Sequence, residues 1–159
     1  MAVHPIPPLY GPASRTLVLG SFPSVKSREA MFFYHHPQNR FWRVLAAVWG
    51  VPVPETVAEK RALVLDHGLA LWDVVASCDI DGSSDASIRA AEPTELGPIL
   101  AEAPITRIFC NGGTAWRLYG RLQQPRTGMP AVQLPSTSPA NASWRLEDLI
   151  RAWSVLREG

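Results

Sequence analysis

Residues 15–24, Arg15-Thr-Leu-Val-Leu-Gly-Ser-Phe-Pro-Ser24, form an apolar run that ends in glycine and passes into a turn. A short apolar run bounded by turn residues predicts a buried strand. A second such strand is expected in Ile105-Thr-Arg-Ile-Phe-Cys-Asn111, which two glycines follow, and a third in Ala131-Val-Gln-Leu134, which a proline stops.

Helical patterns separate these strands. The pattern is strongest over residues 39–49, where large apolar side chains recur at helical spacing. Helices are expected at 27–34, 39–49, 55–67, 95–102, 114–122 and 143–156, with Ser27 capping the first and Ser143 the last. Residues 69–75 fit a short strand or turn, and residues 77–87 a polar loop. Strands that alternate with helices predict an α/β sandwich around a mostly parallel sheet.

Length and composition exclude several classes of protein. The chain has 159 residues, of which 47% are hydrophobic and 18% charged, so we expect one folded domain over 1–159 with an extended, proline-rich arm at 1–14. No apolar run is long enough for a membrane span, and no secretory signal pattern opens the chain, so a cytoplasmic protein is expected. The net charge of +1 limits any nucleic-acid contact to a local patch.

The chemistry is expected at the carboxyl ends of the strands, where α/β sheets bind their ligands. Residues 20–24, 111–114 and 135–141 occupy those ends and are expected to converge. Asn111 suits either the reading of a base edge or a turn, and the hydroxyls of 135–141 suit either phosphate binding or a plain loop between prolines. Asn39 could serve chemistry or cap the helix that follows it.

The acidic residues have equally plain interpretations. Asp79, Asp81 and Asp85 fit a solvated loop, with a carboxylate pair for acid–base chemistry or cation binding as the alternative. Asp73 fits the role of a hydrogen-bond partner that supports the structure. The two cysteines lack metal-site spacing, and adjacent histidines at 35 and 36 rarely face one ion. No metal site is therefore expected.

Together the segments resemble the uracil-DNA glycosylase superfamily, whose motifs are a Gly-x-Asx-Pro turn after the first strand and a Pro-Ser loop after the last. Gly20-Ser-Phe-Pro-Ser24 and Pro135-Ser-Thr-Ser-Pro139 stand in those places. His36-Pro-Gln-Asn-Arg-Phe-Trp42 looks like the HPxNxFW segment of the mismatch-specific uracil/thymine glycosylases. With Leu71-Trp-Asp-Val-Val-Ala-Ser-Cys78, the set is most similar to the hypoxanthine-DNA (deoxyinosine) glycosylase branch. The resemblance implies a three-layer sandwich with a central, mostly parallel four-stranded sheet flanked by helices.

Two departures from the superfamily pattern bear on activity. Phe22 stands where most relatives carry the Asp or Asn that activates water, which tells against ordinary uracil excision. Leu134 stands where several relatives have a His or Asn that aids the leaving base. In the hypoxanthine branch the catalytic Asn belongs to the HPxNxFW segment, which corresponds to Asn39 here.

The resemblance implies a role for each site residue. Asn39 is expected to position the attacking water and to stabilise the oxocarbenium ion through its carbonyl dipole. The flipped base is expected to stack on Tyr34, to be read by Asn111 and to contact the backbone of Phe22. The hydroxyls that would grip DNA phosphates are those of Ser24, Ser27, Ser136 and Ser138.

The resulting expectation is a monomeric, monofunctional enzyme that needs neither metal nor organic cofactor. It would act on DNA that contains a deaminated base, in the cytoplasm at the nucleoid. One alternative is a mismatch-specific uracil/thymine-DNA glycosylase, which Asn39 keeps open. Two others are a catalytically silent nucleic-acid-binding module and an enzyme acting on a free nucleoside.

Overall fold

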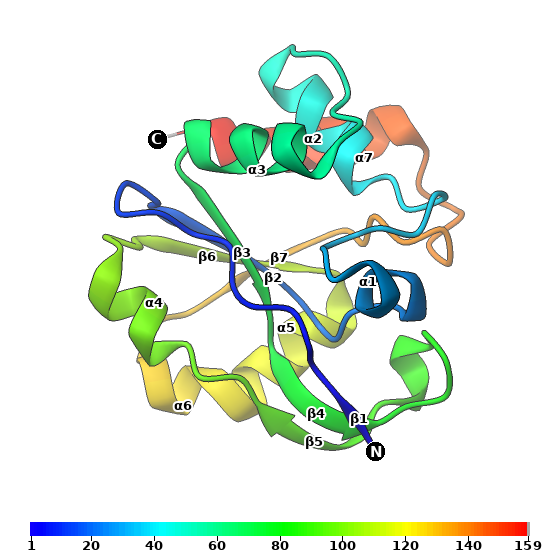
Figure 1. The fold of residues 1–159 in the computed structure, drawn as a ribbon, viewed down its shortest axis with the longest axis vertical. Coiled ribbons are helices and arrows are strands. Elements are labelled where there is room, and N and C mark those ends of the chain that lie inside the picture. The colour runs from blue at the N-terminus through cyan, green and yellow to red at the C-terminus, as the bar shows by residue number, and fades with distance from the viewer. Residues whose placement is uncertain (159) are drawn as a thin grey trace.

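A computed structural model of the chain describes residues 1–158, and its centre is a parallel sheet of four strands in the order β3-β2-β6-β7 (Figure 1). The strands are β2 (Thr16–Gly20), β3 (Leu69–Asp73), β6 (Arg107–Asn111) and β7 (Val132–Leu134). All three pairings are parallel, and Gly20 at the end of β2 lies opposite Asp73 at the end of β3. The predicted four-stranded sheet is thereby confirmed.

Helices cover both faces of this sheet, so the fold has three layers (Figure 1). One face carries α2 (Phe41–Trp49), α3 (Val57–Asp66) and α7 (Leu146–Trp153), whose apolar sides form a core with Val18 and Phe109. The other face carries α4 (Gly97–Glu102), α5 (Gly113–Leu118) and α6 (Gln124–Thr127). Leu17, Leu19 and Cys110 pack toward that second core, as alternation along buried strands requires.

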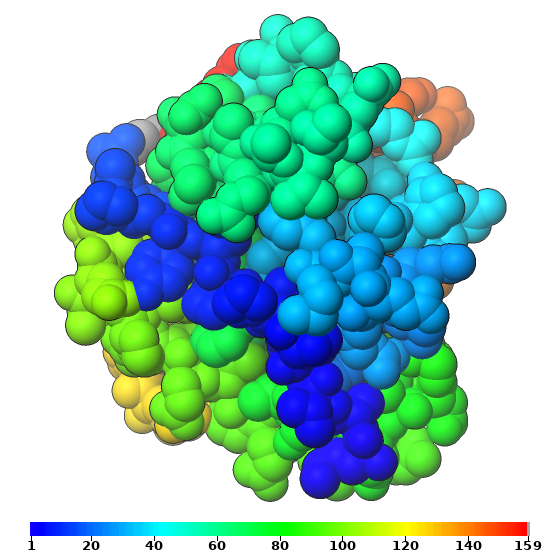
Figure 2. All heavy atoms as spheres, viewed as in Figure 1, coloured from blue at the N-terminus to red at the C-terminus, as the bar shows by residue number. Residues whose placement is uncertain are grey.

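A second, antiparallel sheet of three strands was not expected from the sequence. It consists of β1 (Ala2–Val3), β4 (Val75–Asp79) and β5 (Arg89–Pro93), in the order β1-β4-β5. The predicted loop at 77–87 is therefore partly strand, and it also holds a short 3-10 helix at Asp85–Ser87. The arm of residues 1–14 runs extended across one face of the molecule (Figure 2) and supplies the edge strand β1.

Two predicted helix caps are wrong. Helix α1 spans Val25–Ala30 and is capped by Ser24, whose hydroxyl accepts from Ser27 N–H at 3.1 Å; Ser27 lies inside the helix. Helix α7 begins at Leu146, and its cap is Arg145 rather than Ser143. The chain also continues from α5 into a turn of π-helix at Tyr119–Gln123 before α6. None of the helices in residues 1–158 has both the length and the apolar character needed to cross a bilayer.

Candidate active site

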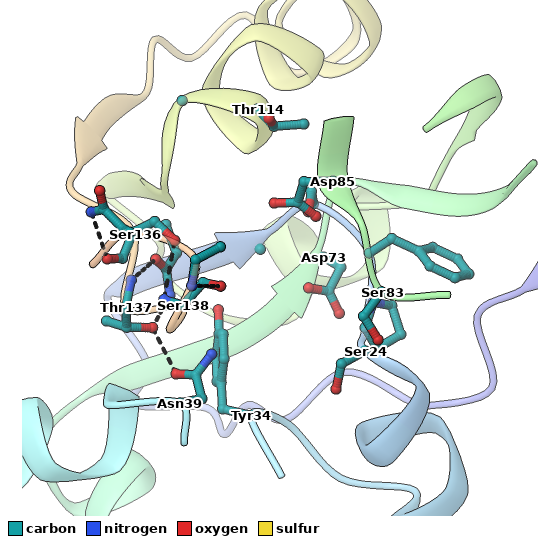
Figure 3. Close-up of a pocket in the computed structure, with 18 of the residues that line it drawn as sticks. Ser24, Tyr34, Asn39, Asp73, Ser83, Asp85, Thr114, Ser136, Thr137 and Ser138 are labelled. Carbon is teal, nitrogen blue, oxygen red and sulfur yellow. Dashed lines mark hydrogen bonds between the residues drawn. The ribbon is translucent and has the colours of Figure 1, made fainter. Parts of the chain in front are cut away.

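A cavity of about 860 Å³ opens at the carboxyl ends of β2, β3 and β6. Residues 20–24, 111–114 and 135–141 all contribute to its wall, which confirms that the three segments converge. Helix α1 and the segment around Asp85 close its other side (Figure 3). Every residue predicted for the site contributes to this wall: Phe22, Ser24, Ser27, Tyr34, Asn39, Asn111, Ser136 and Ser138.

The predicted residues differ in how far they can reach a ligand. The Phe22 side chain is buried and packs edge-on against His4 at 5.9 Å between ring centroids, with the Arg28 guanidinium over its ring. Ser27 is also buried, and its hydroxyl accepts from Ser24 Oγ–H and from His35 N–H, both at 3.0 Å. Ser27 therefore holds the turn between 24 and 35 in shape and has no exposed surface to offer a phosphate.

Tyr34 is held in a conformation that aims its phenol into the cavity. Its φ of 50° lies in the left-handed region, which costs a non-glycine residue about 1–3 kcal/mol. One face of its ring stacks on Phe41 at 4.0 Å between centroids. Its hydroxyl is buried and lies near the side chain of Asn111, but no contact within residues 1–158 has the geometry of a hydrogen bond to it. Burial, with a contribution from the nearby Asp73 carboxylate, raises the pKa of Tyr34, so the phenol stays neutral.

Asn39, just before α2, and Asn111, at the end of β6, are tied together through Thr137, whose bond to Asn39 is drawn in Figure 3. The Thr137 hydroxyl donates to Asn39 Oδ1 at 2.8 Å and accepts from Asn111 Nδ2 at 3.0 Å. The backbone N–H of Thr137 donates to Asn111 Oδ1, also at 3.0 Å. Since Thr137 is fully buried, this network fixes the orientation of both amides.

The network decides which atom Asn39 can offer to a ligand. Its Oδ1 accepts from Phe41 N–H at 2.9 Å as well as from Thr137, so both lone pairs of this oxygen are used. Its nitrogen is turned toward Tyr34 (Figure 3), and no acceptor among the described residues engages it. The N-cap of α2 is Arg40, so the prediction that Asn39 caps this helix is wrong; Asn39 closes the turn before it. Asn39 also presents a donor to the cavity, whereas the sequence suggested a carbonyl oriented toward water.

Carboxylates dominate the electrostatics of the cavity. Asp73 and Asp85 both line it, and no Lys, Arg or His of residues 1–158 does so. Asp85 begins the exposed 3-10 helix, but its carboxyl group turns inward and accepts from Ser21 Oγ–H at 2.7 Å. Desolvation raises the pKa of Asp85, which the Ser21 hydrogen bond partly offsets. A site of this kind favours positive charge that develops on a bound substrate.

Two arginines brace the loops on either side. The Arg40 guanidinium donates to the carbonyls of Ser138 and Asn141 at 3.0 and 3.1 Å, and so holds residues 135–141 against the start of α2. Arg28 donates to the carbonyls of Pro23 and Gly82 at 3.2 and 2.9 Å. Both arginines therefore hold the loops around the cavity in place through hydrogen bonds to backbone carbonyls.

The sequence of residues 7–157 matches the family described as the uracil DNA glycosylase superfamily. The chain belongs to the uracil DNA glycosylase superfamily. It is 32% identical to the hypoxanthine DNA glycosylase of Methanosarcina acetivorans over 79% of each chain. It is 28% identical to the hypoxanthine DNA glycosylase of Methanosarcina barkeri over 67% of this chain and 68% of that one. The solution structure of a uracil DNA glycosylase candidate from M. acetivorans superposes with a TM-score of 0.78 at 25% identity, covering 96% of this chain and 97% of that one.

Membership in this superfamily makes the chain a DNA glycosylase, an enzyme that hydrolyses N-glycosidic bonds. The sequence predicts the three segments that form the site, but not three side chains that organise it: those of Thr137, Asp73 and His4. Thr137 lies between Ser136 and Ser138, whose hydroxyls the sequence points to. Thr137 is completely buried, and the sequence does not reveal this. Asp73 was treated as structural, and His4, which contacts it, lies 69 residues away in the arm. No group of three or more His, Cys, Asp or Glu residues that could hold a metal ion occurs in residues 1–158.

Replacing Thr137 with valine tests the network directly. Valine keeps the volume but removes the hydroxyl that orients Asn39 and satisfies Asn111. We expect the free energy of unfolding to fall by about 1–3 kcal/mol, because buried polar groups lose their partner. Single-turnover base excision should also fall at least about tenfold as Asn39 becomes free to rotate. Denaturant melts and rapid-quench assays measure the two effects.

Two further variants separate positioning from simple packing. Thr137→Ser retains the hydroxyl and should recover most of the excision rate, while Thr106→Val changes an exposed threonine and should alter neither quantity. A Thr137→Val protein that excises bases at the wild-type rate would show that the network does not orient the amide of Asn39.

Proposed function

We propose that this glycosylase removes hypoxanthine from DNA by hydrolysis, after the deoxyinosine nucleotide has flipped into the cavity. The observation that carries the proposal is the fixed amide of Asn39, which faces the cavity in a chain that has Phe22 at the usual water-activating position. The two Methanosarcina relatives named hypoxanthine DNA glycosylases support the choice of base.

The proposed reaction needs one water and no cofactor. Water oxygen attacks C1′ while the N-glycosidic bond breaks, and the base leaves with the bonding electron pair. The water loses a proton to solvent, the base gains one, and the products are free hypoxanthine and an abasic deoxyribose. The Asn39 amide donates from Nδ2 to the water oxygen and thereby fixes its position under C1′. The Asp85 carboxylate, which also lines the cavity, stabilises the oxocarbenium ion that develops.

The flipped base is proposed to lie against the face of Tyr34 that Phe41 leaves uncovered, with its edge toward the ends of β2 and β3. The backbone of Phe22 lines the cavity on the other side. Asn111 is proposed to read the edge of the base with the N–H and the lone pair that its two bonds to Thr137 leave unused.

The grip on DNA phosphates is proposed to come mainly from Ser136 and Ser138. Ser136 Oγ accepts from Ser138 N–H and Ser138 Oγ accepts from Ala140 N–H, so both hydroxyl protons remain free to donate. Ser24 donates its hydroxyl proton to Ser27 within the turn, which assigns these two serines to holding the turn in shape.

Removing both free hydroxyls should weaken binding to DNA. We expect a Ser136→Ala, Ser138→Ala double variant to raise the Kd for deoxyinosine duplex about tenfold, since two hydrogen bonds of about 0.5–1.5 kcal/mol each are lost. Fluorescence anisotropy with a labelled duplex measures the change. Ser143→Ala, an exposed serine that does not line the cavity, is the matched control. An unchanged Kd in the double variant would place the phosphate contacts elsewhere.

A mismatch-specific uracil/thymine glycosylase is the second candidate, because Asn39 and the surrounding segment are shared with that group and the superposed solution structure is a uracil DNA glycosylase candidate. Single-turnover assays on otherwise identical oligonucleotides with one deoxyinosine or one deoxyuridine, single-stranded and opposite each normal base, distinguish the two functions. We expect cleavage after alkali with deoxyinosine and little with deoxyuridine. The reverse order would favour the second candidate, and no cleavage of either would favour a DNA-binding protein without turnover.

A further inference from the structure

The lining of the cavity includes a carboxylate, that of Asp73, to which the mechanism above gives no part. Asp73 ends β3, and its side chain is 6% exposed. Its Oδ2 accepts a hydrogen bond from His4 Nε2 at 2.7 Å. Its Oδ1 receives no hydrogen bond from residues 1–158 and lies at Gly20, where an added Cβ would be only 2.4 Å from this oxygen. The absent side chain of Gly20 leaves Oδ1 open to the cavity.

His4 fixes what Asp73 can do. The backbone N–H of Ile6 donates to His4 Nδ1 at 3.2 Å, so Nδ1 is the acceptor and the ring proton lies on Nε2. That proton is donated to Asp73 Oδ2. The imidazole is almost completely buried, at 2% exposed, and is packed edge-on against Phe22 and Trp72. The arm therefore holds the carboxylate in one orientation, with a single acceptor oxygen directed to the cavity.

The side-chain amide oxygens that line the cavity already accept hydrogen bonds. Asn39 Oδ1 accepts two hydrogen bonds, and Asn111 Oδ1 accepts one from Thr137 N–H. Asp73 Oδ1 thus stands out as a charged, buried acceptor without a donor. The buried hydroxyl of Tyr34 lies beside it, because the same Cβ added at Gly20 would be 3.1 Å from Tyr34 Oη. A ligand that offers an N–H to this corner would satisfy the carboxylate.

We propose that Asp73 Oδ1 selects deaminated bases by accepting the lactam N–H that deamination creates, and that His4 is the positioning residue that keeps this oxygen an acceptor. Hydrolytic deamination of adenine turns N1 from an acceptor into an N–H donor, and deamination of cytosine does the same at N3. A carboxylate attracts the N–H of hypoxanthine and repels the lone pair at N1 of adenine. This assignment rests on the proposed glycosylase function and defines how the site distinguishes a deaminated base from the amino base that gave rise to it.

Asp73→Asn tests the assignment with a change of one atom. His4 Nε2–H still requires an acceptor, so it holds the amide oxygen in the place of Oδ2 and turns the NH₂ group toward the cavity. The reading group becomes a donor, which opposes the N1–H of hypoxanthine but matches the N1 lone pair of unsubstituted purine. Single-turnover excision and duplex binding are measured for DNA with deoxyinosine or with the purine deoxynucleoside at the same position.

We expect Asp73→Asn to lower the rate on deoxyinosine by about 10²-fold or more and to leave the rate on the purine nucleotide equal or raised. Binding should follow the same order, with wild type preferring deoxyinosine over purine at least about tenfold and the variant losing that preference. Equal losses on both bases would overturn the assignment, because Asp73 would then act on a step common to all bases. No change on either base would overturn it as well.

Two controls keep these outcomes interpretable. Asp79→Asn removes one carboxylate outside the cavity and should leave the preference between the two bases intact. The purine nucleotide lacks the N1–H of deoxyinosine. Comparing the two DNAs with the wild-type protein therefore tests the assignment even if Asp73→Asn does not fold. If wild type excises neither base yet binds deoxyinosine preferentially, the glycosylase proposal fails while the reading by Asp73 stands; equal binding of both bases overturns the reading.

Discussion

Asn39→Ala is expected to reduce single-turnover excision of hypoxanthine by at least about 10²-fold, because the donor that fixes the attacking water is lost. The variant should still fold. The Asn39 side chain also accepts from Phe41 N–H, and loss of such a hydrogen bond costs about 0.5–1.5 kcal/mol, which a domain of this size tolerates. Rapid-quench kinetics on a deoxyinosine duplex measure the loss, and a thermal melt measures the stability.

Asn39→Asp separates the hydrogen bond that Asn39 accepts from Phe41 N–H from its role in the reaction. The aspartate keeps an oxygen for Phe41 N–H and for the Thr137 hydroxyl, so stability should stay near that of wild type. It replaces the cavity-facing NH₂ with an oxygen, so the excision rate should fall as far as it does in Asn39→Ala. Gln38→Ala, at the exposed neighbouring residue, is the matched control and should change neither quantity. An Asn39→Asp variant as fast as wild type would contradict the donor role.

Gly20→Ala is expected to have the second largest effect. A Cβ at this position would lie 2.4 Å from Asp73 Oδ1 and 3.1 Å from Tyr34 Oη, and Asp73 cannot move freely because His4 holds its other oxygen. Overpacking of this kind costs about 1–3 kcal/mol. Displacement of the reading carboxylate and of Tyr34 should also reduce excision by about 10²-fold, since errors of about 1 Å in active-site geometry have effects of that size.

The control for this substitution is Gly120→Ala. No atom lies within 4 Å of a Cβ added at Gly120, so the change should leave both melting temperature and excision rate close to wild type. Thermal melts and the same rapid-quench assay compare the pair. If Gly20→Ala matched Gly120→Ala in both measurements, the close approach of Gly20, Asp73 and Tyr34 would have no functional importance.

The sheet and the place of the site were predictable because they depend on local pattern. The apolar runs before Ser21 and Gly112 mark β2 and β6, and parallel order brings their carboxyl ends together. The antiparallel sheet was not predictable in this way. Strand β4 pairs on one side with only two residues of the arm and on the other through shifted register with β5, so no regular alternation signals it.

For the side chains at the site, the sequence predicts which residues line the cavity but not how they are oriented. Asn39 and Tyr34 were selected from a short motif, and both line the cavity. Their orientations depend on contacts across the chain: Thr137 lies 98 residues from Asn39, and His4 lies 69 residues from Asp73. A hydroxyl or carboxylate in sequence does not reveal whether its partner is water or a buried amide. Thr137 and Asp73 therefore required the folded structure, as did the finding that Asn39 offers its nitrogen.

The most direct measurement is mass-spectrometric identification of the products released from a deoxyinosine duplex by wild type and by Asn39→Ala. We expect wild type to release free hypoxanthine in amounts equal to the abasic sites formed, with strands that remain unbroken until alkali is added, and Asn39→Ala to release little. Release of uracil but not hypoxanthine from matched duplexes, or equal release by the two proteins, would contradict it.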